Sequence, residues 1–261
     1  MKLELEGKRV LVAGASRGLG EAIARSLAEE GCRVVAAART VEKIEAWKGA
    51  LPTEIGARID GRRFDLAAIE SIDVLADELL ASGGVDILIN NCGGPAAGGA
   101  LGSSMEAWNK AFQSMASSVF HLTDRLVRPM IERKWGRVIT IGSSGIEQPI
   151  PNLALSNGIR AAVAGWSKSL SAEVAADGVT VNMVLPGRID TERVQSLDAA
   201  RATRENVDVE DVRTLSAKEI PARRYGRPEE FAAVVVFLAS APAAYVTGSM
   251  VRIDGGLIKS I

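Results

Sequence analysis

Histidine, cysteine and tyrosine are scarce in this chain of 261 residues, which has one histidine, two cysteines and two tyrosines. Cys32 and Cys92 show neither metal-ligand spacing nor a disulfide framework, so we expect free thiols and no metal site. The opening stretch, MKLELEGKRVLVAG, lacks the uncharged core and cleavage site of a secretion signal. No apolar run approaches the roughly 20 residues that span a bilayer. We therefore expect a soluble, cytoplasmic protein.

Neither sign of charge is in excess, because 32 acidic residues nearly balance 31 basic ones. The chain thus has no global field that would favour nucleic acid, an anionic membrane or an acidic partner, and a small-molecule substrate fits better. Hydrophobic residues make up 47% of the chain, which is enough for a large core. The length suits one α/β domain over residues 1–261.

Short runs rich in β-branched residues alternate with longer segments whose apolar residues recur with a period near 3.6. Such alternation predicts a Rossmann-type, doubly wound parallel sheet with helices on both faces. The predicted strands are RVLVAG, CRVVAAA, DILIN, RVITIG, VTVNMVLPG and MVRIDGG. The predicted helices are Gly20–Glu30, Ser71–Ala81, Met105–Lys134, Ser156–Ala176 and Pro228–Ser240.

Residues 191–224 interrupt this alternation with a charged, weakly amphipathic stretch. An excursion of that length inside a compact domain is more often a helical lid over a site than a free loop. We therefore expect a lid-like substrate segment here, with a surface insertion as the alternative.

The first predicted strand leads into AGASRGLGEAIARSLA, in which Gly14, Gly18 and Gly20 have the spacing G-x-x-x-G-x-G. Glycines allow a sharp turn and a close approach of the backbone to a pyrophosphate, whose charge the positive end of the next helix stabilises. Because this pattern follows a strand and opens a helix, it predicts a dinucleotide-binding site.

The end of the second predicted strand, VVAAARTVEK, indicates which dinucleotide binds. A carboxylate there would bond the ribose 2′-hydroxyl and repel a 2′-phosphate, but Ala38 and Arg39 occupy the position. Arg17, in the glycine loop, could approach the same phosphate from the other side. Two arginines near one point favour NADP(H) over NAD(H), although each could instead be a solvated surface charge.

Further motifs occur in a fixed order along the chain. They are AGASRGLG, FDL at 64–66, NNCGG at 90–94, GRVITIGSS at 136–144, SKSLSAEVAADGVTVNMVLPGRIDT from 167, RYGRPEEFA from 224 and YVTGSMVRIDGG from 245. Together they resemble the short-chain dehydrogenase/reductase family, of the kind that includes bacterial 3-oxoacyl-carrier-protein reductases. The resemblance covers nearly the whole chain, and it implies an oxidoreductase that assembles into homo-oligomers. We expect a homotetramer built on two-fold axes, with a dimer as the alternative.

The resemblance also implies which residues bind the cofactor. The glycine loop would surround the phosphates, and three later segments would contact the adenine, the adenosine ribose and the nicotinamide. The residues implied are Gly14, Ser16, Arg17, Gly18, Leu19 and Gly20 for the phosphates, Asp65 and Leu66 for the adenine, Asn91 and Gly93 for the ribose, and Pro186, Gly187, Ile189 and Thr191 for the nicotinamide end.

Members of this family normally use a serine, a tyrosine, a lysine four residues after the tyrosine, and an asparagine on the long helix. Ser143 matches the serine. The downstream stretch GWSKSLSAEVA fixes the register and places Ser156 at the tyrosine position and Arg160 at the lysine position. Met115, seven residues after Trp108, replaces the asparagine.

Ser156 and Arg160 suit a different task from a tyrosine–lysine relay. An aliphatic hydroxyl is a far weaker acid than a phenol, and a guanidinium stays protonated. The pair is therefore better suited to holding an anion or a polar substrate than to passing a proton. Tyr225 and Tyr245 lie in segments that the family uses structurally, so we predict that ordinary tyrosine-dependent chemistry is slow or absent.

Other polar side chains are further candidates. Glu147 is a candidate general acid or a surface carboxylate, and Ser144 could replace or assist Ser143. Arg188 could meet a substrate carboxylate near the nicotinamide or lie at the surface. For His121, the single histidine, we expect a structural role.

Two functions remain open from the sequence. In the first, an NADP(H)-dependent oxidoreductase acts on a small carbonyl or hydroxyl compound, with Ser143 on the carbonyl oxygen and Arg160 on the ribose or substrate. The proton would then come through Ser156 with water, or from Glu147. In the second, the fold serves a lyase, an isomerase or a nucleotide-binding regulatory protein. The glycine loop favours the first function, and the loss of tyrosine and lysine favours the second.

Overall fold

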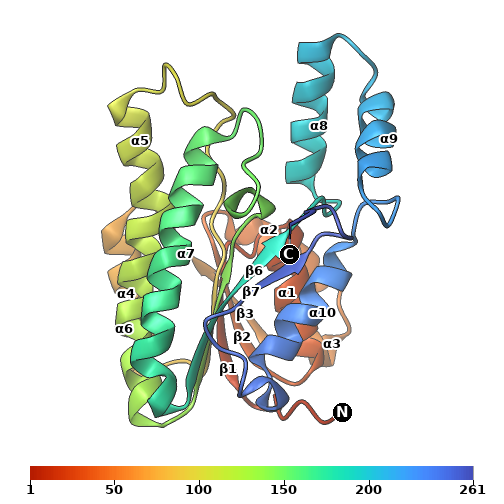
Figure 1. Ribbon diagram of the computed structural model, residues 1–261. Helices are drawn as coiled ribbons and strands as arrows, with labels where there is room; N and C mark the ends of the chain where they lie inside the picture. Colours follow the sequence, from red (N-terminus) through yellow and green to blue (C-terminus); the bar gives the residue numbers. More distant parts are fainter. Residues whose placement is uncertain (261) are drawn as a thin grey trace.

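Seven parallel strands form one sheet in the order β3-β2-β1-β4-β5-β6-β7 in the computed structural model, which describes residues 1–260 (Figure 1). The strand order reverses between β1 and β4, which opens a crevice at the carboxyl ends of these strands. The predicted doubly wound fold is therefore confirmed. The strands are β1 (Arg9–Ala13), β2 (Arg33–Ala38), β3 (Ile59–Arg63), β4 (Ile87–Asn90), β5 (Gly136–Ile141), β6 (Val179–Pro186) and β7 (Met250–Ile253).

Helices cover both faces of the sheet, with α4, α6 and α7 on one side and α1 and α10 on the other (Figure 1). Both faces of the central strands are consequently dry, and β4 and β5 are buried at every position. The helices are α1 (Gly18–Glu29), α2 (Val41–Gly49), α3 (Thr53–Gly56), α4 (Ile69–Ala81), α5 (Met105–Phe112), α6 (Ser118–Glu132), α7 (Ala154–Val174), α8 (Glu192–Glu205), α9 (Val209–Glu219) and α10 (Pro228–Ala239).

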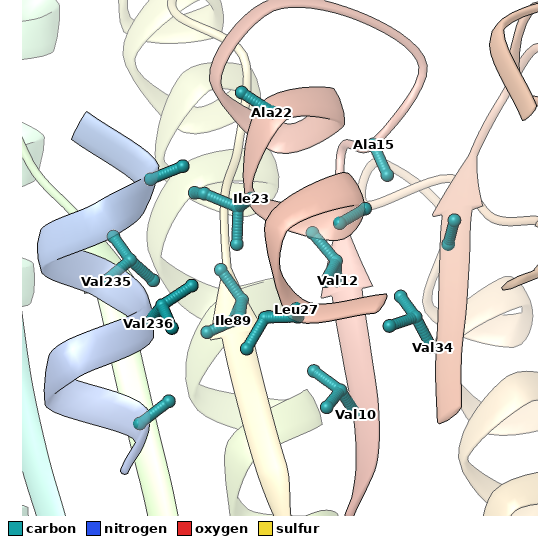
Figure 2. Close-up of a cluster of buried hydrophobic side chains, with 14 of the residues drawn as sticks. Val10, Val12, Ala15, Ala22, Ile23, Leu27, Val34, Ile89, Val235 and Val236 are labelled. Carbon is teal, nitrogen blue, oxygen red and sulfur yellow. The ribbon is translucent and has the colours of Figure 1, made fainter. Parts of the chain in front are cut away.

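The largest part of the core lies between the sheet and the helices α1 and α10 (Figure 2). Each fully buried aliphatic side chain of this kind contributes about 1.5–3 kcal/mol to folding. This packing fixes α1, and with it the glycine loop, against the ends of β1 and β4. The side chains include Val10 and Val12 of β1, Ile89 of β4, Ile23 and Leu27 of α1, and Val235 and Val236 of α10.

The segment between β2 and α4 contains elements that the sequence analysis did not place, namely α2, α3 and β3. Only Ile59 of the β3 sequence IDGRR is buried. This strand pairs with β2 alone and lies at the edge of the sheet, so charged and small residues are tolerated. The apolar run that marks the other strands is therefore missing.

The long helix predicted from Met105 to Lys134 is divided into α5 and α6 by a wider π-helical turn, Gln113–Ser117. A π turn accommodates an extra residue and rotates the helix that follows. Ser118 donates a hydrogen bond from its hydroxyl to the Leu66 carbonyl at this point, which ties the turn to the loop after β3. The period of the apolar residues does not reveal such a turn.

Within residues 1–260, no helix combines the length and apolar character needed to cross a membrane, and no cluster of histidine, cysteine or acidic side chains could hold a metal ion. Cys32 and Cys92 are free, as expected. Burial raises the pKa of the Cys32 thiol to about 12, so this side chain is unreactive and packs in the hydrophobic core.

Residues 191–224 form a helical hairpin, α8 and α9, beyond the carboxyl end of the sheet (Figure 1). The buried carboxylate of Asp198 accepts hydrogen bonds from Arg188 Nη1 at 2.6 Å and the Tyr225 hydroxyl at 2.9 Å. Arg213 of α9 pairs with Asp190 at 3.1 Å, and its guanidinium lies 5.0 Å from the centre of the Tyr225 ring. This network fixes the base of the hairpin to the loop after β6.

Replacement of Asp198 by alanine leaves Arg188 and Tyr225 without their buried acceptor. We expect the free energy of unfolding to fall by about 3 kcal/mol, the cost of breaking a buried pair. The hairpin should also be cut faster by protease. Urea unfolding and limited proteolysis measure both effects, and Glu219→Ala, an exposed acidic position on α9, is the matched control. Equal stability of the two variants would contradict the assigned anchor.

Candidate active site

The residues implied by the sequence come together at the carboxyl ends of β1, β4, β5 and β6, where parallel sheets bind ligands. The glycine loop follows β1, and the loop 91–104 follows β4. Ser143 follows β5, and Pro186–Thr191 closes β6 and leads into α8. Helix α7 supplies Ser156 and Arg160 from the side of the crevice.

The glycine loop has backbone conformations that side chains would obstruct. Gly14 and Gly18 have φ of 65° and 59°, in the left-handed region. A Cβ atom on Gly20 would lie 2.2 Å from the Gly14 carbonyl oxygen, so this position admits glycine alone. Asn91 donates a hydrogen bond from Nδ2 to that carbonyl at 3.0 Å and thereby ties the end of β4 to the loop.

The two arginines predicted to flank one phosphate have different surroundings. Arg39 is exposed directly beyond β2, where the ribose-binding carboxylate of NAD-dependent sites would stand. Arg17 forms an ion pair with Glu192 in the first turn of α8, and this contact lowers the pKa of the Glu192 carboxyl. Arg17 therefore joins the glycine loop to the hairpin, whereas the Arg39 side chain has no hydrogen bond or ion pair within residues 1–260.

The segments predicted to contact the adenine and the nicotinamide are held by hydrogen bonds from backbone amides to side-chain oxygens. The amide of Asp65 donates to Ser71 Oγ at 3.0 Å, and the Asp65 carboxylate accepts from the Ala67 amide at 3.0 Å. Thr191 Oγ1 caps α8 by accepting from the Val194 amide at 3.4 Å. Both segments thus have fixed conformations at the edge of the crevice.

Ser143 keeps a hydroxyl proton available for a substrate. Its oxygen accepts a hydrogen bond from the Gly145 amide at 3.0 Å and caps a short 3₁₀ turn, Ser144–Ile146. Because the oxygen accepts from the backbone, the hydroxyl can direct its proton outward to a carbonyl oxygen. Ser144 is buried beneath this turn.

Arg160 contacts each wall of the crevice. Its Nε donates to Ser156 Oγ at 3.3 Å, Nη1 donates to the Ile141 carbonyl at 2.8 Å, and Nη2 donates to the Cys92 carbonyl at 3.3 Å. The guanidinium thus joins α7 to the end of β5 and to the loop after β4. Ser156 is buried with a donor on its oxygen, so its proton also points away from Arg160.

Met115, predicted to stand where the family has an asparagine, is apolar and buried. Met115 lies in the π turn with 2% of its surface exposed and packs with Leu155 and Ile159 of α7. Its carbonyl oxygen lies 4.0 Å from Cys92 Sγ. The site therefore has no side-chain amide here to hold a relay of protons.

Three further side chains that the sequence analysis considered have ion-pair or hydrogen-bond partners. Glu147 lies 3.3 Å from Arg252 of β7, so its carboxylate is ion-paired at the sheet edge. Arg188, considered for a substrate carboxylate, bonds the buried Asp198 instead. His121 lies 2.7 Å from Asp73 of α4 and joins the two helices, which is the structural role expected of it.

The sequence analysis missed one basic side chain at the site. Arg193, in the first turn of α8, donates from Nη2 to the Pro95 carbonyl at 2.9 Å, across the crevice from its own helix. Its place two residues after Thr191, which was predicted to contact the nicotinamide end, could have indicated that Arg193 lies at the site. Partial desolvation, followed by the charges of Arg160 and then Arg17, lowers the pKa of Arg193.

A family model described as enoyl-(acyl carrier protein) reductase matches residues 14–258. The chain is 35% identical to the 3-oxoacyl-[acyl-carrier-protein] reductase FabG of Vibrio cholerae and 36% identical to that of Escherichia coli, over 98% of this chain and 99% of each relative. The chain belongs to the short-chain dehydrogenase/reductase family.

Solved structures of this short-chain dehydrogenase/reductase fold superpose closely. YwfH, an NADPH-dependent reductase involved in bacilysin biosynthesis, has a TM-score of 0.92 at 28% identity, covering 98% of this chain and all of its own. The L-sorbose reductase of Gluconobacter frateurii, complexed with NADPH and L-sorbose, has a TM-score of 0.93 at 31% identity over the full length of both chains.

Alanine at Gly20 tests the glycine loop, because its Cβ would overlap the Gly14 carbonyl. We expect NADPH and NADH to bind at least about tenfold more weakly, a loss of about 1.4 kcal/mol in binding free energy, because the added methyl group displaces the loop backbone. Energy transfer from tryptophan to the nicotinamide measures binding, and circular dichroism checks the fold. The control is Gly165→Ala on α7, where a Cβ meets no atom within 4 Å. Unchanged dissociation constants in Gly20→Ala would contradict this assignment.

Proposed function

We propose that this protein is an NADPH-dependent reductase that acts on a small carbonyl compound through a catalytic site without tyrosine. The observation that carries the proposal is the glycine loop, tied to Asn91 and closed to any side chain at Gly20, in a chain with serine and arginine at the relay positions. Such a loop has a use only if a dinucleotide approaches its backbone. Reductases among the relatives, two of them with NADPH in their descriptions, support a redox role.

The residues at the crevice fit an NADP(H) molecule. The amino end of α1 and the glycine loop suit the diphosphate, and a Cβ on Gly93 would meet no atom within 4 Å, so the wall beside Asn91 is open. Arg39 suits a 2′-phosphate, and Thr191 and Ile189 border the nicotinamide end. When bound, the reduced cofactor supplies a hydride to an electrophilic carbon.

Three side chains act on the carbonyl oxygen of the substrate. Ser143 donates its free proton to the carbonyl oxygen, which orients the carbon and stabilises the negative charge that develops on the oxygen during hydride transfer. Arg160, held by the Ile141 and Cys92 carbonyls, adds a fixed positive charge that does not titrate. The alkoxide then takes a proton from the Ser156 hydroxyl, which is replenished by water.

This route explains why the site tolerates the loss of a phenol. A tyrosine acts as a general acid in the transition state, whereas Ser143, Ser156 and Arg160 stabilise the charge that precedes proton transfer. The ion pair of Glu147 with Arg252 favours water over this carboxyl as the proton source. The relatives described above are reductases, so a lyase, an isomerase or a regulatory protein is not favoured.

Turnover with a panel of ketones, aldehydes and oxo acids tests the proposal. We expect wild type to oxidise NADPH with at least one compound, and Arg160→Met to lower kcat about 100-fold, the usual effect of losing an oxyanion-stabilising group. Arg128→Met, at an exposed site on α6, is the matched control. Tight NADPH binding without turnover in wild type, together with turnover in Ser156→Tyr/Arg160→Lys, would contradict a tyrosine-free reductase.

The choice of cofactor depends on Arg39. Removal of its guanidinium in Arg39→Ala should weaken NADPH binding about tenfold or more, the loss of a charge-assisted contact, and leave NADH binding unchanged. Fluorescence titrations of both nucleotides measure this. Arg33→Ala, at the exposed opposite end of β2, serves as the control. An equal effect on both nucleotides would exclude contact with the 2′-phosphate.

A further inference from the structure

Two guanidinium groups converge on one short stretch of the loop after β4. Arg160 Nη2 donates to the Cys92 carbonyl at 3.3 Å, and Arg193 Nη2 donates to the Pro95 carbonyl at 2.9 Å. The two arginines come from different elements, α7 and α8, so they reach this stretch from opposite sides of the crevice. The convergence therefore brings two positive charges to one loop, and one of them contacts Ser156.

No carboxylate lies within 4 Å of either guanidinium in residues 1–260. The acid nearest in sequence, Glu192, is paired with Arg17. Partial desolvation, and next the positive charge of Arg160, lower the pKa of Arg193. Like charges gathered without a counter-ion are unfavourable, and an anion placed between them removes the repulsion.

We propose that Arg160 and Arg193 together hold an anionic group of the substrate, a carboxylate, so that the compounds reduced are oxo acids. This inference rests on the proposed reductase function and names its substrate class. Guanidinium groups suit the task because their forked donors match the two oxygens of a carboxylate.

The diphosphate of the cofactor is the other anion that could reach these charges. Its position on the glycine loop is served by the amino end of α1, and Asn91 bonds that loop at Gly14. The two guanidinium groups bond carbonyls further along, at Cys92 and Pro95. Arg193 is also affected more by the charge of Arg160 than by that of Arg17, which belongs to the glycine loop. The substrate side is therefore favoured, and the two sources give different results in the experiment below.

The experiment measures binding of 2-oxobutanoate and phenylpyruvate, and of their methyl esters, by calorimetry to the protein loaded with NADP⁺, which has no hydride to transfer. NADPH binding is measured separately by fluorescence without substrate. In wild type the acids should bind about tenfold more tightly than the esters, the contribution of a charge-assisted contact. Arg193→Met should abolish this preference without weakening NADPH binding, and Arg193→Lys should keep most of it. Arg204→Met, three turns further along α8 and exposed, should behave as wild type.

Each other outcome has a defined meaning. Wild type that binds acids no more tightly than esters would overturn the proposal. Arg193→Met that weakens NADPH and leaves the acid-to-ester ratio unchanged would overturn it too, since the anion would then be the cofactor diphosphate. If the acids bind through Arg193 but no compound is reduced, the anion site stands and the reductase function fails. Reduction of esters and acids with equal efficiency would leave the function standing and overturn the anion site.

Discussion

The guanidinium of Arg160 is the contact on which the geometry of the site depends. It joins α7 to the carboxyl ends of β5 and β4 through three hydrogen bonds, to Ser156 Oγ and to the carbonyls of Ile141 and Cys92. A lysine has one nitrogen, whereas the planar guanidinium of arginine carries three nitrogens at fixed separations. The guanidinium therefore fixes the relative positions of the three acceptors. The orientation of Ser156 and the path of the loop after β4 follow from this arrangement, whereas the Gly145 amide orients Ser143.

The charges of the chain are balanced as a whole but not at the crevice. A formal net charge of −1 gave no reason to expect an anionic ligand. The fold nevertheless gathers Arg17, Arg160 and Arg193 around the groove and commits Glu192 to Arg17, while Glu147 is turned to Arg252 at the sheet edge. A local positive field thus arises in a nearly neutral protein, because the loops at the end of a parallel sheet bring distant residues together.

The sequence predicted the doubly wound sheet and six of its seven strands, because buried parallel strands carry apolar runs. The edge strand IDGRR has no such run, and the π turn at Gln113–Ser117 leaves no signal in the apolar period. The glycine loop was readable because its motif has a local cause. The roles of Arg188 and Arg193 were not, because their partners Asp198 and Pro95 are specified only by the folded hairpin.

In the proposed mechanism Ser156 and water deliver the proton while Arg160 and Ser143 stabilise the charge, so no side chain that titrates between neutral and mildly alkaline pH takes part. The most direct measurement is the rate of NADPH oxidation in a single turnover from about pH 7 to about pH 9.5, where a cation-activated tyrosine titrates. The rate should stay constant over this range, since neither serine nor arginine changes its charge there. A rate that follows one ionisation, and loses that dependence on substitution of a single side chain, would contradict it.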